Sequence, residues 1–169
     1  MLKSMNEIEI IEFKDSTFHQ KYLDDLIGTF NMCQENEQYN NQKGILRGLH
    51  YQVEPYQQAK LIRVVKGAIL SVAVDLRKHS DEYASYVSYE LDDIKREQMF
   101  VPKGYAHGYI TLSEESVVIY KVDEYFNLEA MRGILFSDKT LNIDWRINKG
   151  NIVISQKDAN NSPFKKETL

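Results

Sequence analysis

The sequence has few of the residues that cross-link or interrupt a chain: one cysteine, three prolines and eight glycines among 169 residues. Because a disulfide within the chain needs two cysteines, Cys33 alone excludes a disulfide framework, and it also excludes a zinc site built from several cysteines. The sparse glycine and proline leave no low-complexity linker, and we find no internal repeat. From this length we expect a single domain covering residues 1–169.

Long apolar runs are missing as well. The longest, Ala68 to Val74, contains Ser71 and is far too short to span a bilayer, and the first ten residues have no apolar signal core. The 21 Lys and Arg residues are scattered and the net charge is −4, which disfavours nucleic-acid binding. We therefore expect a soluble cytoplasmic protein with neither a nucleic-acid nor a membrane partner.

What the sequence does contain is a series of short β-type segments. Residues 7–13 predict a first strand, residues 15–28 a short capped helix, and the polar residues 31–43 a loop. Lys66-Gly67 predicts a tight hairpin turn, and residues 79–82 predict another turn. The further candidate strands are 45–52, 59–66, 68–76, 84–91, 97–101, 107–112, 116–123 and 132–136. This spacing predicts an all-β antiparallel sandwich or barrel, around which the last thirty or so residues wrap.

Polar residues lie on or beside these strands, where apolar side chains are expected: Arg47, His50, Lys60, His107 and Tyr120. Each alone has an ordinary explanation, since a strand histidine is usually hydrogen-bonded in the core and a strand-end lysine keeps its ammonium in water. Together they are harder to explain, because burying an unpaired cation is costly. Arg47 and His50 would face opposite ways on an ideal strand, but Gly48 between them permits a bulge. A cavity on which such groups converge would suit an anionic ligand.

A metal site is the alternative use for the histidines. Residues 101–109, VPKGYAHGY, resemble the second motif of the cupins, Pro-x-Gly-x-x-His, whose barrels often hold a metal. The first cupin motif needs a His-x-His pair, and the sequence contains none. With His50 and His107 as the only well-placed imidazoles, we expect no bound metal.

Six segments resemble the dTDP-4-dehydrorhamnose 3,5-epimerase family: GILRGLHYQ, KLIRVVKGAILSVAVDLRKHS, VPKGYAHGYITLS, YKVDEYF, GILFSDKTLNIDW and ISQKD. The resemblance runs from about Gln34 to Asp158. It implies a cupin-like jelly-roll β-barrel with a short N-terminal helix and a wrapping C-terminal segment. It also implies a homodimer that uses no metal or other cofactor and inverts C3 and C5 of a nucleoside-diphosphate 4-keto-6-deoxyhexose.

Carried over residue by residue, the resemblance makes His50 the general base and Asp158 the carboxylate paired with it. Lys60 would lie by the C4 oxygen of the sugar, and Tyr120 would donate a proton on the opposite ring face. The chemistry needs these residue types, because an imidazole titrates near neutrality and a fixed ammonium stabilises enolate charge on O4. A phenol, with an ordinary pKa of about 10, can return a proton without competing as the base.

The resemblance also implies substrate contacts. Arg47 and His107 would line the sugar and phosphate region, and an arginine fork matches phosphate oxygens. Lys157 and the segment from Gln34 to Asn36 would lie toward the nucleotide.

The sequence departs from the family pattern on the nucleotide side. The usual Asp-x-Arg-Gly-x-Phe-x-Glu strand before the helix has no counterpart, and unusual residue types stand at Phe126, Met131, Phe136 and Arg146. The ordinary substrate is the favoured interpretation. The open alternatives are another nucleotide or sugar, inversion at C3 or C5 alone, a weaker dimer, and a non-catalytic nucleotide-sugar-binding cupin. The RGLHYQ segment speaks against a ketoisomerase.

Overall fold

The computed structural model describes residues 3–5, 7–12, 28 and 30–165. Within them, no helix is long or apolar enough to cross a membrane. The helical segments of these described residues are a 3-10 turn, η1 (Lys149–Asn151), and one short α-helix, α2 (Gln156–Ala159). The strands are β1 (Lys3–Met5), β2 (Ile8–Glu12), β3 (Gln34–Asn40), β4 (Ile45–Gln52), β5 (Lys60–Lys66), β6 (Ala68–Asp75), β7 (Tyr86–Asp92), β8 (Glu97–Val101), β9 (Tyr105–Thr111), β10 (Ser116–Val122), β11 (Met131–Gly133) and β12 (Val153–Ile154).

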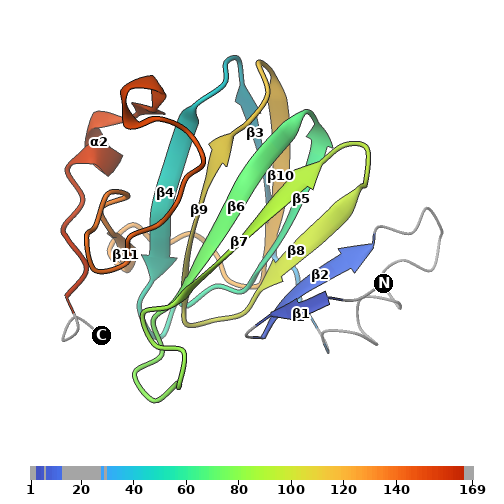
Figure 1. The fold of residues 1–169 in the computed structure, drawn as a ribbon. Coiled ribbons are helices and arrows are strands. Elements are labelled where there is room, and N and C mark those ends of the chain that lie inside the picture. Colours follow the sequence, from blue (N-terminus) through green and yellow to red (C-terminus); the bar gives the residue numbers. More distant parts are fainter. Residues whose placement is uncertain (1–2, 6, 13–27, 29, 166–169) are drawn as a thin grey trace.

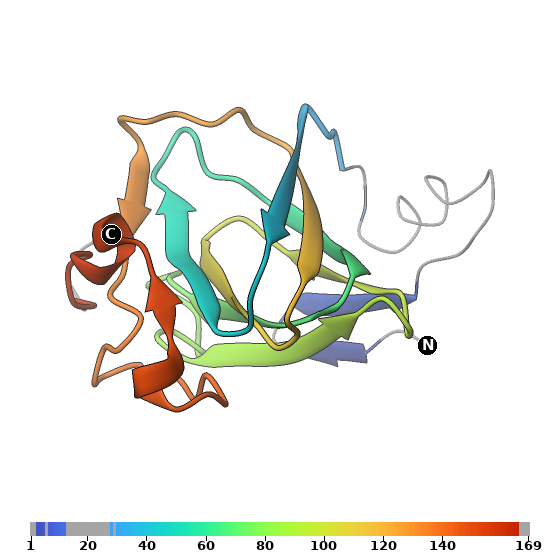
Figure 2. The same cartoon turned by 90° about the horizontal axis from the view of Figure 1, so that it is seen from above.

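Two sheets face each other and form a barrel (Figures 1 and 2). The first sheet has the order β1-β2-β8-β5-β10-β3, and the second has the order β11-β4-β9-β6-β7, with β12 added beside β4. The named strand pairs of the described residues are antiparallel except β12 with β4. The predicted all-β, cupin-like jelly roll is confirmed.

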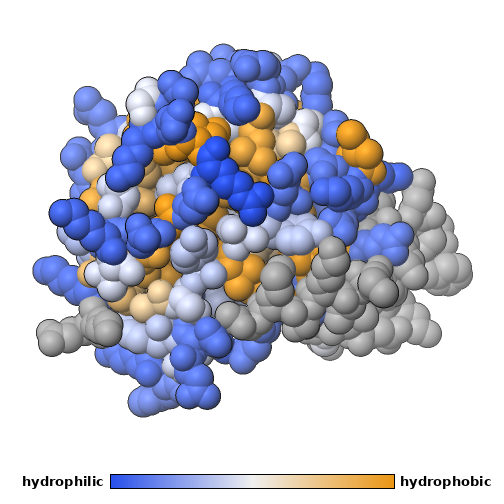
Figure 3. All heavy atoms as spheres, in the orientation of Figure 1, coloured by the Kyte–Doolittle hydropathy of each residue, from blue (hydrophilic) through white to orange (hydrophobic). Residues whose placement is uncertain are grey.

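Apolar side chains from both sheets fill part of the barrel interior. Ile10 and Met99 of the first sheet meet Ile69 and Leu91 of the second, and all four are fully buried. Each such side chain contributes about 1.5–3 kcal/mol relative to an exposed one. On the face shown in Figure 3, hydrophilic side chains cover most of the surface and apolar patches lie between them.

The loop predicted for residues 31–43 is wrong over Gln34–Asn40, because these residues form β3, paired with β10 at the edge of the first sheet. Every second residue of β3 faces inward, and these inward residues are Gln34, Asn36, Gln38 and Asn40. The wall that they form is polar, so the sequence lacks the apolar alternation that normally reveals a strand.

The hairpin predicted at Lys66-Gly67 is also wrong, although the chain does turn there. β5 pairs with β8 and β10 in the first sheet, whereas β6 pairs with β7 and β9 in the second. Gly67 is therefore a corner between sheets. Its φ is +76°, and a Cβ would lie 2.1 Å from the Glu115 carbonyl oxygen, so only glycine fits. The local turn signal does not reveal which strands pair.

The other predicted strands agree with the structure to within a few residues, whereas β1, η1, β12 and α2 were not predicted. The expected strand at 132–136 is shorter, because β11 ends at Gly133, where a Cβ would collide with the Asn161 side chain. The turn expected at 79–82 is confirmed by the Tyr83 N–H donating to the Ser80 carbonyl. The helix predicted for residues 15–28 lies, apart from Gly28, outside the described residues.

The C-terminal segment packs on the outer face of the second sheet, as expected, and lies beside β4 in Figure 2. Ile134, Leu141 and Trp145 belong to one buried cluster with Leu46 of β4. The indole N–H of Trp145 donates to the Phe136 carbonyl at 2.8 Å. β12 then pairs with the start of β4, which brings α2 against that strand.

Candidate active site

A cavity of about 690 Å³ lies between the two sheets, a size typical of small-molecule sites. Its walls come from β3, β4, β5, β9 and β10, and α2 forms part of the rim. All nine residues predicted for the site line this cavity: Gln34, Asn36, Arg47, His50, Lys60, His107, Tyr120, Lys157 and Asp158.

β4 presents both Arg47 and His50 to the cavity. The register between β4 and β9 shifts between these two residues, which is the irregularity expected from Gly48. Gly48 has a φ of +115°, and a Cβ there would lie 2.7 Å from Gly108 Cα and 2.9 Å from the His107 carbonyl oxygen. The backbones approach too closely for any other residue.

Gly48→Ala is therefore expected to lower the free energy of unfolding by about 1–3 kcal/mol, through strain at a positive φ and the clash with β9. Urea unfolding followed by circular dichroism measures this change. Gly150→Ala is the matched control, because a Cβ at Gly150 meets no heavy atom within 4 Å. Equal stability of the two variants would contradict the packing argument.

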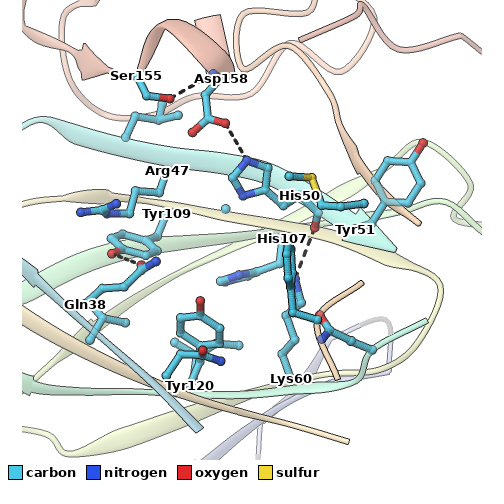
Figure 4. A pocket seen from close by; sticks show the side chains of 18 of the residues that line it. Gln38, Arg47, His50, Tyr51, Lys60, His107, Tyr109, Tyr120, Ser155 and Asp158 are labelled. Carbon is cyan, nitrogen blue, oxygen red and sulfur yellow. Dashed lines mark hydrogen bonds and ion pairs between the residues drawn. The ribbon is translucent and has the colours of Figure 1, made fainter. Parts of the chain in front are cut away.

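Asp158 reaches His50 because the hydroxyl of Ser155 caps α2. The Ser155 hydroxyl accepts the Asp158 N–H at 3.0 Å, and the carboxylate then lies 2.6 Å from His50 Nε2 and 3.4 Å from the Gly48 N–H (Figure 4). Burial alone would raise the pKa of Asp158, but hydrogen bonds from His50, Gly48 and Ser155 outweigh it and lower that pKa. The carboxylate is therefore charged at neutral pH.

Lys60 begins β5 and is buried, with 8% of its surface exposed, so the ordinary explanation of a strand-end lysine in water is wrong. Its Nζ donates to the His50 carbonyl oxygen at 3.3 Å. Burial lowers the pKa of the Lys60 ammonium to about 8. A cation thus lies inside the cavity, next to the imidazole-bearing strand.

His107 lies on β9, and its Nε2 is 2.9 Å from the Ser71 hydroxyl. Burial, followed by the charges of Lys60 and His50, lowers the pKa of His107 well below its usual value. His107 is therefore uncharged at neutral pH and can serve the site as a hydrogen-bonding group rather than as a cation.

Tyr120 lies on β10, in the sheet opposite His50, and its hydroxyl points into the cavity (Figure 4). Burial raises the pKa of this phenol, and the charge of Arg47 opposes only part of that effect. Tyr120 is therefore protonated at neutral pH and can donate a proton.

Sequence reasoning missed Gln38 and Tyr109, which line the cavity, and Asn40, which is hydrogen-bonded to Tyr109. The Tyr109 hydroxyl donates to Gln38 Oε1 at 2.6 Å and accepts from Asn40 Nδ2 at 3.3 Å. Asn40 Oδ1 accepts the Nε–H of Arg47 at 3.0 Å, which directs the guanidinium along the cavity wall. The signal that could have found Gln38 and Asn40 is the uncharged amide side chain at every second position from 34 to 40.

The predicted nucleotide-side residues lie at the cavity rim. Gln34 donates to Asn36 Oδ1 at 2.8 Å and accepts the Phe126 N–H at 3.0 Å. Lys157 is exposed, and Phe126, which also lines the cavity, is 55% exposed.

In the part of the chain that the structure describes, no group of three or more His, Cys, Asp or Glu residues is placed to hold a metal ion. His50 is bonded to Asp158, and His107 is bonded to Ser71.

The model of the dTDP-4-dehydrorhamnose 3,5-epimerase family matches residues 12–166. The chain belongs to this family. The epimerase of Shigella flexneri is 39% identical over 148 residues, 88% of this chain and 81% of the relative. The crystal structure of the Elizabethkingia anophelis epimerase matches with a TM-score of 0.90 at 34% identity, over 100% of this chain and 98% of that one. A Legionella pneumophila epimerase structure, in complex with dTDP-4-keto-L-rhamnose, has a TM-score of 0.85 at 33% identity, over 95% and 89% of the two chains.

The family predicted from the six sequence segments is thus confirmed. As a member of the dTDP-4-dehydrorhamnose 3,5-epimerase family, the protein is an enzyme of the isomerase class. The relatives support a dTDP-sugar 3,5-epimerase activity with a nucleotide sugar as the substrate.

Proposed function

We propose that the protein inverts C3 and C5 of dTDP-4-keto-6-deoxyglucose to give dTDP-4-keto-rhamnose, with His50 as the general base. The observation that carries this proposal is the 2.6 Å bond between His50 Nε2 and Asp158, in a cavity that Lys60 and Tyr120 also line. The carboxylate accepts the Nε2–H and fixes the tautomer, so the Nδ1 lone pair is left to take a proton.

The first step breaks the C–H bond at C3 or C5, next to the C4 ketone. The proton goes to His50, the bonding electrons form a carbon–carbon double bond, and the former carbonyl electron pair becomes negative charge on O4. The ammonium of Lys60 stabilises this charge. Because the charge is absent from the bound ketone, Lys60 lowers the barrier more than it strengthens substrate binding.

Inversion requires that the proton return on the other ring face. Tyr120 lies in the opposite sheet from His50, which supports its role as the donor. Its O–H bond breaks as the new C–H bond forms, and the electrons on O4 return to the ketone. The imidazolium then loses its proton to water and the phenolate takes one from water, so the enzyme is reset for the second centre.

The rest of the substrate suits the remaining polar groups of the cavity. Arg47 carries a guanidinium that matches diphosphate oxygens, and Lys157 adds a cation at the rim. The Legionella relative with dTDP-4-keto-L-rhamnose supports a dTDP sugar as the ligand here too.

Proton NMR in deuterium oxide tests the proposed reaction. With dTDP-4-keto-6-deoxyglucose, the C3 and C5 proton signals are both expected to disappear, and the rhamno product is expected to form. Loss of only one signal would identify a single-centre epimerase. If the protein binds the dTDP sugar but neither proton exchanges with deuterium, the protein is a non-catalytic nucleotide-sugar-binding cupin.

Tyr120→Phe is expected to lower formation of the inverted product by about 10²–10⁴-fold, because the donor on the second face is removed. Deuterium exchange at the first centre is expected to persist, since His50 can still remove a proton and return a deuteron on the same face. NMR distinguishes exchange from inversion. Tyr39→Phe, at an exposed tyrosine on β3, is the control. Inversion at the wild-type rate in Tyr120→Phe would contradict the role of this phenol.

We also propose a homodimer, the assembly that the sequence resemblance to the family implies. Light scattering coupled to size exclusion is expected to give twice the 19.8 kDa mass of the chain, and a mass of one chain would refute the dimer.

A further inference from the structure

Glutamine side chains hold the loop between β10 and β11 by its backbone. We define the 124–128 loop as the part of this connection that carries the exposed apolar side chains Tyr125, Phe126 and Leu128. In Figure 2 the connection runs from β10 to β11 alongside the connection between β4 and β5. It has no strand or helix of its own, so its backbone groups need partners from elsewhere.

Three glutamines from three parts of the chain supply these partners. Gln58 donates to the Glu124 carbonyl at 2.7 Å, and Gln52 donates to the Tyr125 carbonyl at 3.2 Å. In the other direction, the amide N–H of residue 126 donates to Gln34 at 3.0 Å, and that of residue 127 donates to Gln52 at 2.7 Å.

Gln52 is the centre of this arrangement. It is the last residue of β4, two positions after His50, and only 5% of its surface is exposed. Its amide also donates to the Tyr56 carbonyl at 2.6 Å, so one buried side chain ties β4 to both neighbouring connections. Both ends of the Gln52 amide are used within the protein, which argues against a direct contact with substrate.

Phe126 is the side chain that this arrangement places. It lines the polar cavity and is also more than half exposed, so its ring lies at the mouth. An aromatic ring beside polar groups is a platform on which a planar nucleotide base stacks, a contact worth about 1–3 kcal/mol per base. A stacking platform is effective only if its backbone is held in place before the ligand arrives.

We propose that Gln52 is a positioning residue for nucleotide binding, acting through the 124–128 loop to hold Phe126 at the cavity mouth. Gln34 and Gln58 also hold the 124–128 loop, through their hydrogen bonds to the backbone of residues 126 and 124. This inference rests on the proposed dTDP-sugar substrate. It concerns binding and not the chemical step, because none of the glutamine bonds involves His50, Lys60 or Tyr120.

The test is the dissociation constant for dTDP, measured by calorimetry, together with kcat and KM. Gln52→Leu keeps the size and removes every hydrogen bond, and it is expected to weaken dTDP binding and raise KM by about tenfold while kcat changes by less than about twofold. Gln58→Leu, which loses a single bond, is expected to weaken binding by about threefold and serves as the milder variant if Gln52→Leu folds poorly. Gln57→Leu is the control, because this adjacent glutamine does not line the cavity.

A double-mutant cycle shows whether Gln52 acts through Phe126. In a Phe126→Ala background, Gln52→Leu is expected to weaken dTDP binding by less than about twofold further, since the platform is already gone. Faster hydrogen exchange at the amides of residues 126 and 127 is expected in Gln52→Leu without ligand.

Three results would overturn the inference. Wild-type affinity for dTDP in Gln52→Leu would do so, as would an equal loss of affinity with and without Phe126, or a fall in kcat with KM unchanged. If the wild-type protein itself does not bind dTDP, both the proposed nucleotide substrate and this inference are refuted. If wild type and Gln52→Leu bind dTDP with equal affinity, only the inference about Gln52 is refuted.

Discussion

Replacing His50 with asparagine is expected to lower kcat by about 10²–10⁴-fold, the usual contribution of a general base. The asparagine side chain is of similar size but cannot take a proton. Affinity for dTDP is expected to change little, because in the proposed reaction the base acts on the sugar ring rather than on the nucleotide. The measurement is deuterium incorporation at C3 and C5 by NMR, combined with calorimetric binding of dTDP.

His79→Asn is the matched control, because His79 lies exposed in the turn between β6 and β7. Asp158→Asn should resemble His50→Asn in direction, since it removes the charge that fixes the imidazole tautomer and stabilises the imidazolium. Undiminished exchange in His50→Asn would show that another group removes the proton, and loss of dTDP binding in that variant would place His50 in recognition rather than catalysis.

Lys60→Met is expected to lower kcat by about 10²–10³-fold, as expected for the removal of a donor that stabilises developing negative charge. In the proposed mechanism only the ammonium form of Lys60 stabilises the enolate. We therefore expect kcat/KM of the wild-type protein to fall above a pH of about 8, the pKa to which burial lowers Lys60. Measuring kcat/KM from pH 6 to 10 tests this decrease. A profile that stays flat through pH 9 would contradict a requirement for the charged lysine.

The same substitution is expected to stabilise the fold. A lysine pKa of about 8 against the usual 10.5 means that the folded state disfavours the charge by about 3 kcal/mol below pH 8. Between pH 8 and 10.5 the unfolded chain binds the additional proton, so the free energy of unfolding of the wild-type protein rises with pH. At pH 7, Lys60→Met is expected to unfold with a free energy about 1–3 kcal/mol higher than wild type, allowing for its lost hydrogen bond.

Urea unfolding at pH 7 and pH 10 measures this difference, and the advantage of Lys60→Met is expected to shrink at the higher pH. Lys66→Met is the control at the other end of β5, where the ammonium is exposed and pairs with Glu115. It is expected to have little effect at either pH. A Lys60→Met variant that is less stable than wild type would show that the cavity accommodates the charge without cost.

The residue types and their spacing alone predicted the all-β class, most of the strands and a cavity on which Arg47, His50, Lys60, His107 and Tyr120 converge. The resemblance to the family added Gln34, Asn36, Lys157 and Asp158, and the structure shows that all nine residues line one cavity. The signals for the cavity were cationic and imidazole side chains on strands that should be apolar. Gly48, between Arg47 and His50, was a further signal. A buried cation is costly, so its presence in a strand indicates a site even before the fold is known. The weaker periodicity of the last thirty or so residues predicted that they wrap the barrel.

Only the tertiary structure decided which segments meet. β3 was hidden because its inward face lines a polar cavity, and the turn at Gly67 joins two sheets rather than two paired strands. Asp158 lies 108 residues from His50, and the two meet only because the C-terminal segment packs on β4 and Ser155 caps α2. The lowered pKa of Lys60 and the glutamine contacts to the 124–128 loop likewise depend on burial and long-range pairing. Such properties arise from distances between residues far apart in the chain, and local sequence patterns contain no information about those distances.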